Sequence, residues 1–225
     1  MSKFRFKAGS ILWPLIVSSA LAVCLYVCRV LASGNFRYWY LVWNLFLGWL
    51  PLVFGYLLVK WLRKGTWLSF KGLGLTALWL GFLPNSFYIV SDFIHLAPTY
   101  EIGLLFDVVL FMIFAWNGLL LGFISVYMIH SELRKRLRAR LTIMLVGLVF
   151  ILSSFAIYMG RFLTWNTWDI VINPGGILFD ISDRIIRPTA YPNTFTTTTL
   201  FSVVLITLYY TVYKLVDAVK NSGKN

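Results

Sequence analysis

The sequence predicts an all-α integral membrane protein, a bundle of six transmembrane helices. Of its 225 residues, 60% are hydrophobic and only 12% are charged, about half the charged share of roughly 25% found in soluble domains. The mean hydropathy is +0.79. Six apolar runs also reach the length of about 20 residues that a helix needs to cross a bilayer. A water-soluble fold would leave too much of this surface exposed, so lipid is the expected solvent for most of the chain.

The six expected spans are separated by short polar segments, and none has a Lys or Arg near its middle. They cover about 10–32, 38–62, 70–90, 103–129, 141–163 and 195–216. The first run resembles a secretory signal peptide, because it follows Lys3, Arg5 and Lys7. Its apolar stretch is longer than a usual signal core, however, and Arg29 lies beside the position where cleavage would fall. We therefore expect a retained span within a single polytopic domain, 1–225.

Basic residues are unequally divided between the two sides of the predicted bundle. Fifteen Lys and Arg residues fall on the side that holds both termini, and five fall on the other. Cytoplasmic segments carry this excess in membrane proteins, so we expect both termini in the cytoplasm and the protein in a cell membrane. The net charge of +12 then reflects topology, and the densest basic loop, 130–140, is expected to attract anionic head groups. Membrane lipids are the expected partners, and nucleic acid is not.

The outer loop, 164–194, is expected to contain a short amphipathic helix. Asp180 and Arg184 form an acid-before-base pair four residues apart, as do Asp183 and Arg187, and this spacing stabilises helices. Apolar residues occupy the remaining faces of the segment 177–186. The helix is expected either to lie on the outer leaflet or to cap the bundle.

Polar groups gather at the end of the third apolar run, in the segment LPNSFYIVSDFIHL, 83–96. Four of them fall within about 80° of one another on a helix: Asn85, Tyr88, Asp92 and His95. Ser91 is expected to point elsewhere. Such groups are costly against lipid tails, so the stripe must face protein or water. Pro84 removes one backbone hydrogen bond, and we expect a kink or break there.

More polar residues are expected at the same outer level. Arg161 ends the fifth span and needs a carboxylate partner, which Asp92 or Asp107 can supply. Asn166 and Asp169 follow it in sequence. The tryptophans of this segment, and the aromatic residues that open the second span, are expected to form an interfacial aromatic belt. The outer half of the bundle therefore collects an unusual number of polar groups.

Two motifs carry a family resemblance. The patterns L-P-N-x-x-Y-I-x-S-D-x-x-H-L at 83–96 and G-R-x-x-x-W-N-x-W-D at 160–169 resemble those of a widespread family of small bacterial membrane proteins, classed as a domain of unknown function. The resemblance covers most of the chain, from the second span to Asp169. The family often has a further basic residue where this chain has Thr164. The resemblance implies a bacterial multi-pass membrane protein and no particular activity.

The convergence of polar groups favours a membrane-embedded enzyme that acts on a lipid or lipid-linked substrate at the outer leaflet. The candidate catalytic residues are Asp92, His95 and Asp107. Asp92 and His95 would form a carboxylate-oriented general base, or would bind a divalent metal such as zinc as a cofactor. The candidate substrate-binding residues, among them an arginine suited to phosphate or carboxylate, are Asn85, Tyr88, Arg161, Asn166 and Asp169.

Two other functions stay open. A structural or partner-binding scaffold would use the same polar groups as ties between helices, each contributing about 0.6 kcal/mol. A proton-coupled transporter would use buried Asp, His and Arg as an ion route. Against the transporter, the inner halves of the spans offer almost no polar groups to continue such a route.

Overall fold

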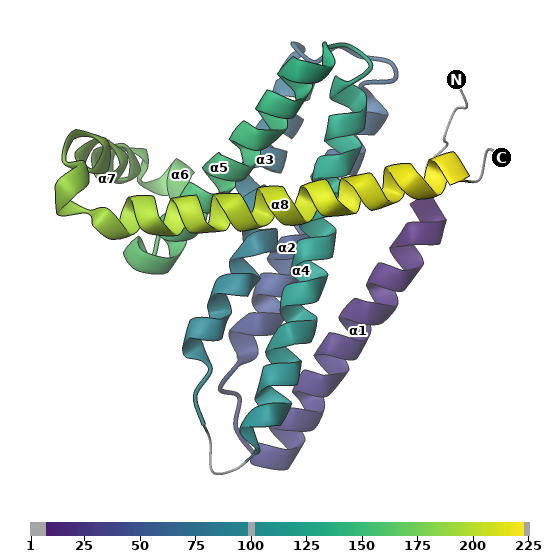
Figure 1. Ribbon diagram of the computed structural model, residues 1–225. Coiled ribbons are helices and arrows are strands. Elements are labelled where there is room, and N and C mark those ends of the chain that lie inside the picture. Colours follow the sequence, from purple (N-terminus) through teal and green to yellow (C-terminus); the bar gives the residue numbers. More distant parts are fainter. Residues whose placement is uncertain (1–7, 99–101, 223–225) are drawn as a thin grey trace.

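The computed structural model describes residues 8–98 and 102–222, which form helices joined by turns and contain no strand. Figure 1 shows their arrangement. The α-helices run in chain order α1 (Ala8–Ser33), α2 (Trp39–Trp61), α3 (Phe70–Ser91), α4 (Leu104–Leu133), α5 (Ala139–Leu163), α6 (Asp169–Ile172), α7 (Pro174–Ile186) and α8 (Pro192–Ser222). Two short 3₁₀ turns, η1 (Asp92–His95) and η2 (Pro188–Ala190), follow α3 and α7.

Within these residues, six helices are long and apolar enough to cross a membrane: α1, α2, α3, α4, α5 and α8. They coincide with the six spans expected from the sequence, and the all-α prediction is confirmed. The clearest differences are at α8, which runs Pro192–Ser222 rather than about 195–216, and at α4, which continues to Leu133 rather than ending near residue 129. The last turn of α4 extends into the basic segment, which therefore begins as helix.

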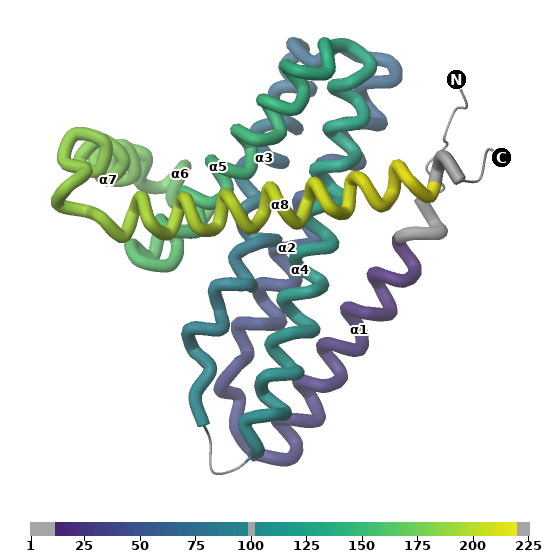
Figure 2. The backbone as a smooth tube through the Cα atoms, in the orientation of Figure 1, coloured from purple at the N-terminus to yellow at the C-terminus, as the bar shows by residue number. Residues whose placement is uncertain are grey.

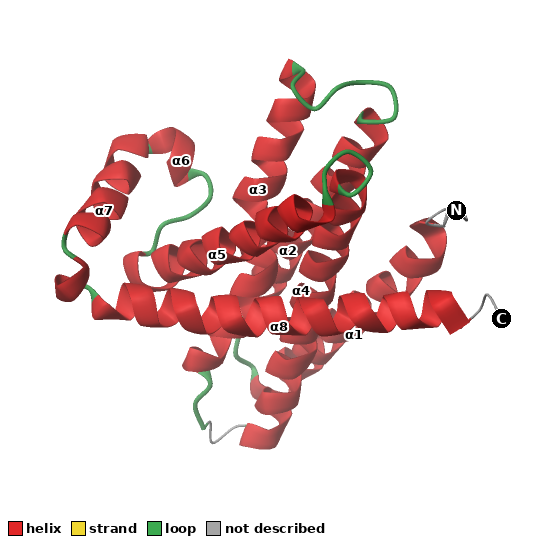
Figure 3. Ribbon diagram, turned by 45° about the horizontal axis from the view of Figure 1, so that its top comes forward, coloured by secondary structure: helices red, strands yellow, loops and turns green. Residues whose placement is uncertain are grey.

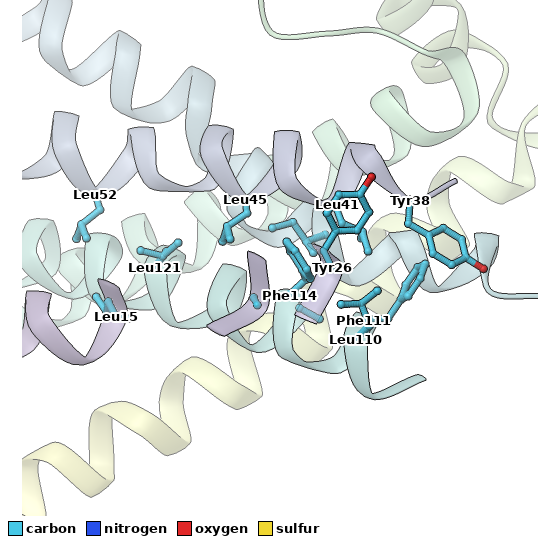
Figure 4. Packing of buried hydrophobic residues seen from close by; sticks show 13 residues of the cluster. Leu15, Tyr26, Tyr38, Leu41, Leu45, Leu52, Leu110, Phe111, Phe114 and Leu121 are labelled. Carbon is cyan, nitrogen blue, oxygen red and sulfur yellow. The ribbon is translucent and has the colours of Figure 1, made fainter. Parts of the chain in front are cut away.

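The helices α2, α3 and α4 pack against one another and form the centre of the molecule. On this centre, α1 packs against α4, and α5 packs against α3. Figure 4 shows one apolar cluster of this core, in which Leu15, Leu45, Phe114 and Leu121 lie close together. The remaining span, α8, packs mainly on α5. It runs across α2 and α4 in Figure 1 and beside α5 in Figure 3.

The connecting loops separate into two groups at opposite ends of the bundle. Figure 2 shows the α2–α3 and α4–α5 loops together at the top, and the α1–α2 loop together with the start of α4 at the bottom. The two upper loops contact each other: the Arg136 guanidinium donates to the Leu62 carbonyl at 3.0 Å and lies 5.5 Å from the centre of the Trp67 ring. These are the loops rich in Lys and Arg, so basic residues concentrate at one end.

The amphipathic helix predicted in the loop 164–194 is present as α7. The Asn173 side chain caps it by accepting a hydrogen bond from the Gly176 N–H at 3.0 Å. Both expected ion pairs form, Arg184–Asp180 at 3.0 Å and Arg187–Asp183 at 3.6 Å. Four large apolar side chains of α7 are 64–74% exposed: Leu178, Phe179, Ile185 and Ile186. One face of α7 thus packs on the bundle and another presents apolar groups outward.

Of the kink or break expected at Pro84, the break is absent. The α-helical segment α3 continues through Pro84 to Ser91, and only then tightens into the 3₁₀ turn η1. Proline is tolerated inside membrane helices because neighbouring groups satisfy the freed backbone carbonyl. The change in helix type therefore falls at Asp92, one residue after the end of α3.

Small residues allow α3 and α4 to approach closely. A Cβ atom added at Gly118 would lie 2.3 Å from the Ser86 carbonyl oxygen, and one at Gly122 would lie 2.4 Å from the Phe87 ring. Ser86 itself donates to the Gly48 carbonyl of α2 at 2.9 Å. The three central helices therefore meet at one tightly packed level, as small residues permit in membrane bundles.

Replacing Gly118 tests this contact. Gly118→Ala should lower the free energy of unfolding by about 1–3 kcal/mol, because the methyl group must displace backbone rather than a flexible side chain. Gly147→Ala is the matched control in α5, since nothing lies within 4 Å of its Cβ position. Thermal unfolding in detergent measures both variants. Equal melting temperatures for the two variants would contradict the close approach of α3 and α4.

Candidate functional site

A cavity of about 430 Å³ lies at the end of the bundle away from the basic loops. Its walls come from α2, from α3 with η1, and from the last turns of α5, and residues of the segment 165–181 close it. Apolar side chains such as Trp43, Phe155 and Ile177 form part of the lining, and a connected set of polar groups forms the rest. The cavity combines an apolar wall with a polar centre, as small-molecule sites do.

The polar centre is the ion pair between Asp92 and Arg161. The Asp92 carboxylate, in a residue only 1% exposed, accepts a hydrogen bond from the Arg161 Nη2 at 2.5 Å through Oδ1. Its second oxygen, Oδ2, accepts from the Asn44 Nδ2 at 2.8 Å. One carboxylate on η1 therefore connects to both α5 and α2.

Arg161 makes several further contacts. Its Nε and Nη2 donate to the Ser91 hydroxyl at 3.0 and 2.7 Å, and its Nη1 donates to the His95 Nε2 at 2.6 Å. The guanidinium also stacks 4.4 Å from the centre of the Tyr88 ring, an attractive arrangement for a cation. The side chain is 10% exposed. Its orientation is fixed by four different groups of α3 and η1.

His95 is the exposed member of the network. A guanidinium can only donate hydrogen bonds, so the His95 Nε2 facing Arg161 must be the acceptor. The imidazole is then neutral and carries its proton on Nδ1. Its ring meets the edge of Tyr40 at 5.6 Å between centroids. An unprotonated imidazole nitrogen thus lies in a cavity, held by a cation.

Hydrogen bonds hold the segment after α5 against the cavity. Thr164 adopts a left-handed conformation with φ of 60°, which ends α5 and turns the chain back over the bundle. Thr167 then accepts a hydrogen bond from the Asn85 Nδ2 at 3.0 Å and donates to the Gly81 carbonyl at 3.3 Å. Trp165 donates to Asp180 of α7 at 2.7 Å. Asn85 therefore holds the wall of the cavity in addition to lining it.

Most of the site residues expected from the sequence come together. Six of them line the cavity: Asn85, Tyr88, Asp92, His95, Arg161 and Asn166. Asp107 does not, because it is fully buried in an ion pair with Arg29 of α1, at 2.7 and 3.2 Å. Asp169 does not line it either, and instead accepts from the Asn166 N–H at 2.7 Å at the start of α6. The carboxylate partner of Arg161 is thus Asp92.

Several site residues were missed in the sequence. Asn44 is an amide inside an apolar span, and its cost in lipid is a signal that it has a partner. Ser91 was expected to point elsewhere, which is wrong, since it accepts two hydrogen bonds from Arg161. Tyr40, Trp43 and Trp165, assigned to an aromatic belt, line the cavity.

The residues present do not fit a divalent metal. The described part of the chain contains no group of three or more His, Cys, Asp or Glu side chains able to hold one. Both Asp92 oxygens are already occupied by donors, and the candidate nitrogen of His95 faces the Arg161 guanidinium. A metal bound there would lie beside a fixed positive charge. These side chains instead suit a polar ligand that forms hydrogen bonds with them.

Fold and site together define a polytopic helical membrane protein with a polar cavity at one end of its bundle. Residues 43–212 match the model of a family described as "Protein of unknown function (DUF1361)", and the chain belongs to this family. No curated protein and no solved structure matches it. The matched segment contains the whole Asp92 network, whereas α1, with Arg29, lies before it.

Replacing Arg161 tests how much the buried ion pair with Asp92 stabilises the fold. Arg161→Met should lower the free energy of unfolding by about 3–5 kcal/mol, because it leaves the Asp92 carboxylate buried without its charged partner. The double variant Asp92→Asn/Arg161→Met should recover part of this loss.

The matched control is Arg187→Met, since the side chain of Arg187 is 71% exposed in its pair with Asp183. An exposed pair contributes at most about 1 kcal/mol. Denaturation in detergent measures all three variants. A similar loss of unfolding free energy in Arg161→Met and Arg187→Met would show that the buried pair stabilises the protein no more than an exposed one.

Proposed function

We propose that this protein is a membrane-embedded enzyme that acts on a lipid or lipid-linked molecule, whose polar head group binds in the cavity around Asp92 and Arg161. One observation carries the proposal. The same cavity joins a charged, hydrogen-bonded centre to apolar walls, and one of these walls is α7, which presents exposed apolar side chains on another face. A molecule with a polar head and an apolar tail matches that combination.

The proposal assigns different roles to His95 and Asp92. His95 is the candidate catalytic base, because it is exposed and its Nε2 carries no proton. A head group that binds the Arg161 guanidinium would displace the Arg161–His95 hydrogen bond and free this nitrogen to remove a proton. Asp92 is a positioning residue, because it is buried and acts through Arg161. The residues proposed to bind the head group are Asn85, Tyr88, Arg161 and Asn166. Asp107 and Asp169 have no role in the proposed chemistry, because they lie outside the cavity.

We further propose a bacterial cell membrane as the location, with both termini in the cytoplasm. The clustering of the basic loops at one end of the bundle (Figure 2) supports this orientation. The cavity then opens at the level of the outer leaflet, and lipids are the proposed partners.

A structural role is the second candidate, and one observation favours it. Both oxygens of Asp92 are occupied by groups of the protein itself, so the network also ties α2, η1 and α5 together without any ligand. A transporter has less support. Between the two ends of the bundle, Phe87 packs against Phe123 and Phe150 with ring centroids 5.5 and 5.8 Å apart, so apolar rings rather than polar groups occupy this level.

Lipid turnover by the purified protein tests the proposed activity. Wild-type protein is reconstituted into vesicles made from the total lipid of the source cells, and mass spectrometry follows every lipid species with time. One species is expected to decrease as a product accumulates, and His95→Ala should slow this about 100-fold or more, the contribution of a general base. Turnover should persist in excess EDTA, since the site residues do not fit a metal.

The control variant is Asp183→Asn, which alters an ion pair on α7 away from the cavity. If no lipid changes with wild-type protein, the enzyme proposal is wrong and the structural role is favoured. If His95→Ala and Asp183→Asn reduce turnover equally, His95 is not the base.

A further inference from the structure

A second polar cavity, of about 220 Å³, lies between the C-terminal end of α4 and the last part of α8. All six residues that line it have polar side chains: Tyr127, His130, Ser131, Arg134, Tyr213 and Asp217. It adjoins the basic α4–α5 loop, at the end of the bundle opposite the first cavity. His130, in the last turn of α4, is one of these six residues.

His130 is 5% exposed and is held in a fixed orientation. Its ring stacks on Tyr213, with centroids 5.0 Å apart and planes at 18°, and its Nδ1 is 2.8 Å from the Tyr209 hydroxyl. A phenol is a good donor, so we assign Nδ1 as the acceptor and place the ring proton on Nε2. Nε2 is buried, and no described residue is its hydrogen-bond partner. A buried donor without a partner costs free energy. His130 lines the cavity but its Nε2 is covered, so a ligand would remove that cost by displacing the side chains over it.

The charges around this donor indicate the chemistry of the ligand. Arg134 donates to the Tyr213 hydroxyl and places a guanidinium, which suits phosphate oxygens, beside the cavity. Asp217 supplies a carboxylate to the same cavity. A simple anion would be repelled by that carboxylate, whereas a group with both a phosphate and an ammonium would match both charges.

The surroundings indicate a lipid as the source of that group. The cavity lies at the ends of two membrane-spanning helices, α4 and α8, where head groups are found. Next to Asp217 on α8, Leu215 and Val219 are 61% and 72% exposed, so acyl chains can pack beside the cavity. Basic residues of the adjoining loop add attraction for phosphate.

We propose that this second cavity binds the head group of a zwitterionic aminophospholipid such as phosphatidylethanolamine. The phosphate is held by Arg134 and the His130 Nε2–H, and the ammonium by Asp217. The site is independent of the first cavity and does not rest on the proposed enzymatic activity.

Binding of short-chain lipids to the full-length protein in detergent tests the proposal. The probes are dihexanoyl phosphatidylethanolamine, dihexanoyl phosphatidylglycerol and inorganic phosphate, titrated separately and followed by native mass spectrometry. Wild-type protein should prefer the ethanolamine lipid. Arg134→Gln and His130→Phe should each weaken its binding about tenfold, the effect of losing a charge-assisted hydrogen bond. Asp217→Asn should abolish the preference for ethanolamine over glycerol without weakening binding of the glycerol lipid.

Arg138→Gln is the matched control, since it removes the same charge from the same loop outside the cavity. Equal losses for Arg134→Gln and Arg138→Gln would overturn the proposal, because they would show general attraction to a basic surface. Inorganic phosphate binding as tightly as the lipid would overturn the lipid assignment. An unchanged preference in Asp217→Asn would overturn the ammonium site, and this exposed residue can be replaced with little risk to folding.

Discussion

The ion pair between Asp92 and Arg161 is the interaction on which the rest of the molecule depends at the cavity end. Two opposite charges inside a membrane protein are stable only when they meet each other and fill their remaining hydrogen bonds. Here Arg161 fills them with Ser91 and His95, and Asp92 with Asn44. The pair also joins two parts of the architecture, because Arg161 belongs to α5, on which α8 packs, and Asp92 follows α3 in the central group. It thereby adds a charged tie to the apolar packing between α5 and α3.

A second buried pair, Arg29–Asp107, shows what separates a structural tie from a candidate site. Both of its side chains have 0% exposure, and Tyr38 covers the guanidinium at 4.3 Å from its ring centre. This pair fastens α1 to α4 and borders no described cavity. The Asp92–Arg161 pair has the same chemistry but keeps an exposed imidazole, three amides and two phenols around an open space of about 430 Å³. The ion pair does not need these additional polar groups for its own stability, and their presence around a cavity is the reason to assign a function there.

The sequence predicts most of this fold because span length and hydropathy are properties of one segment at a time. The polar stripe of Asn85, Tyr88, Asp92 and His95 was visible for the same reason, since the register along a single helix determines it. Pairings between helices are different, because they depend on which faces turn toward each other. The sequence therefore left two partners open for Arg161, and it missed both Asn44 with Asp92 and Arg29 with Asp107. Ser91 was misplaced although it is the last residue of α3: at 100° per residue it lies about 60° from Tyr88, close enough for the long side chain of Arg161 to contact both.

The position of α7 bears on how a substrate would reach the first cavity. Ile177 and Ile181 line that cavity, while Phe179 and Ile186 of the same helix are 71% and 74% exposed. An apolar outer face suits a helix at a membrane surface, so under the proposed function this wall of the cavity would also meet the lipid. Its attachment to α5 is polar, through Trp165 to Asp180 and Arg184 to Tyr158 at 3.4 Å. Under the proposed function, a lipid head group entering beside α7 would exchange hydrogen bonds with these groups on its way to Arg161. An apolar outer face on one wall of a polar cavity is therefore the feature that supports the proposal of a substrate taken from the membrane.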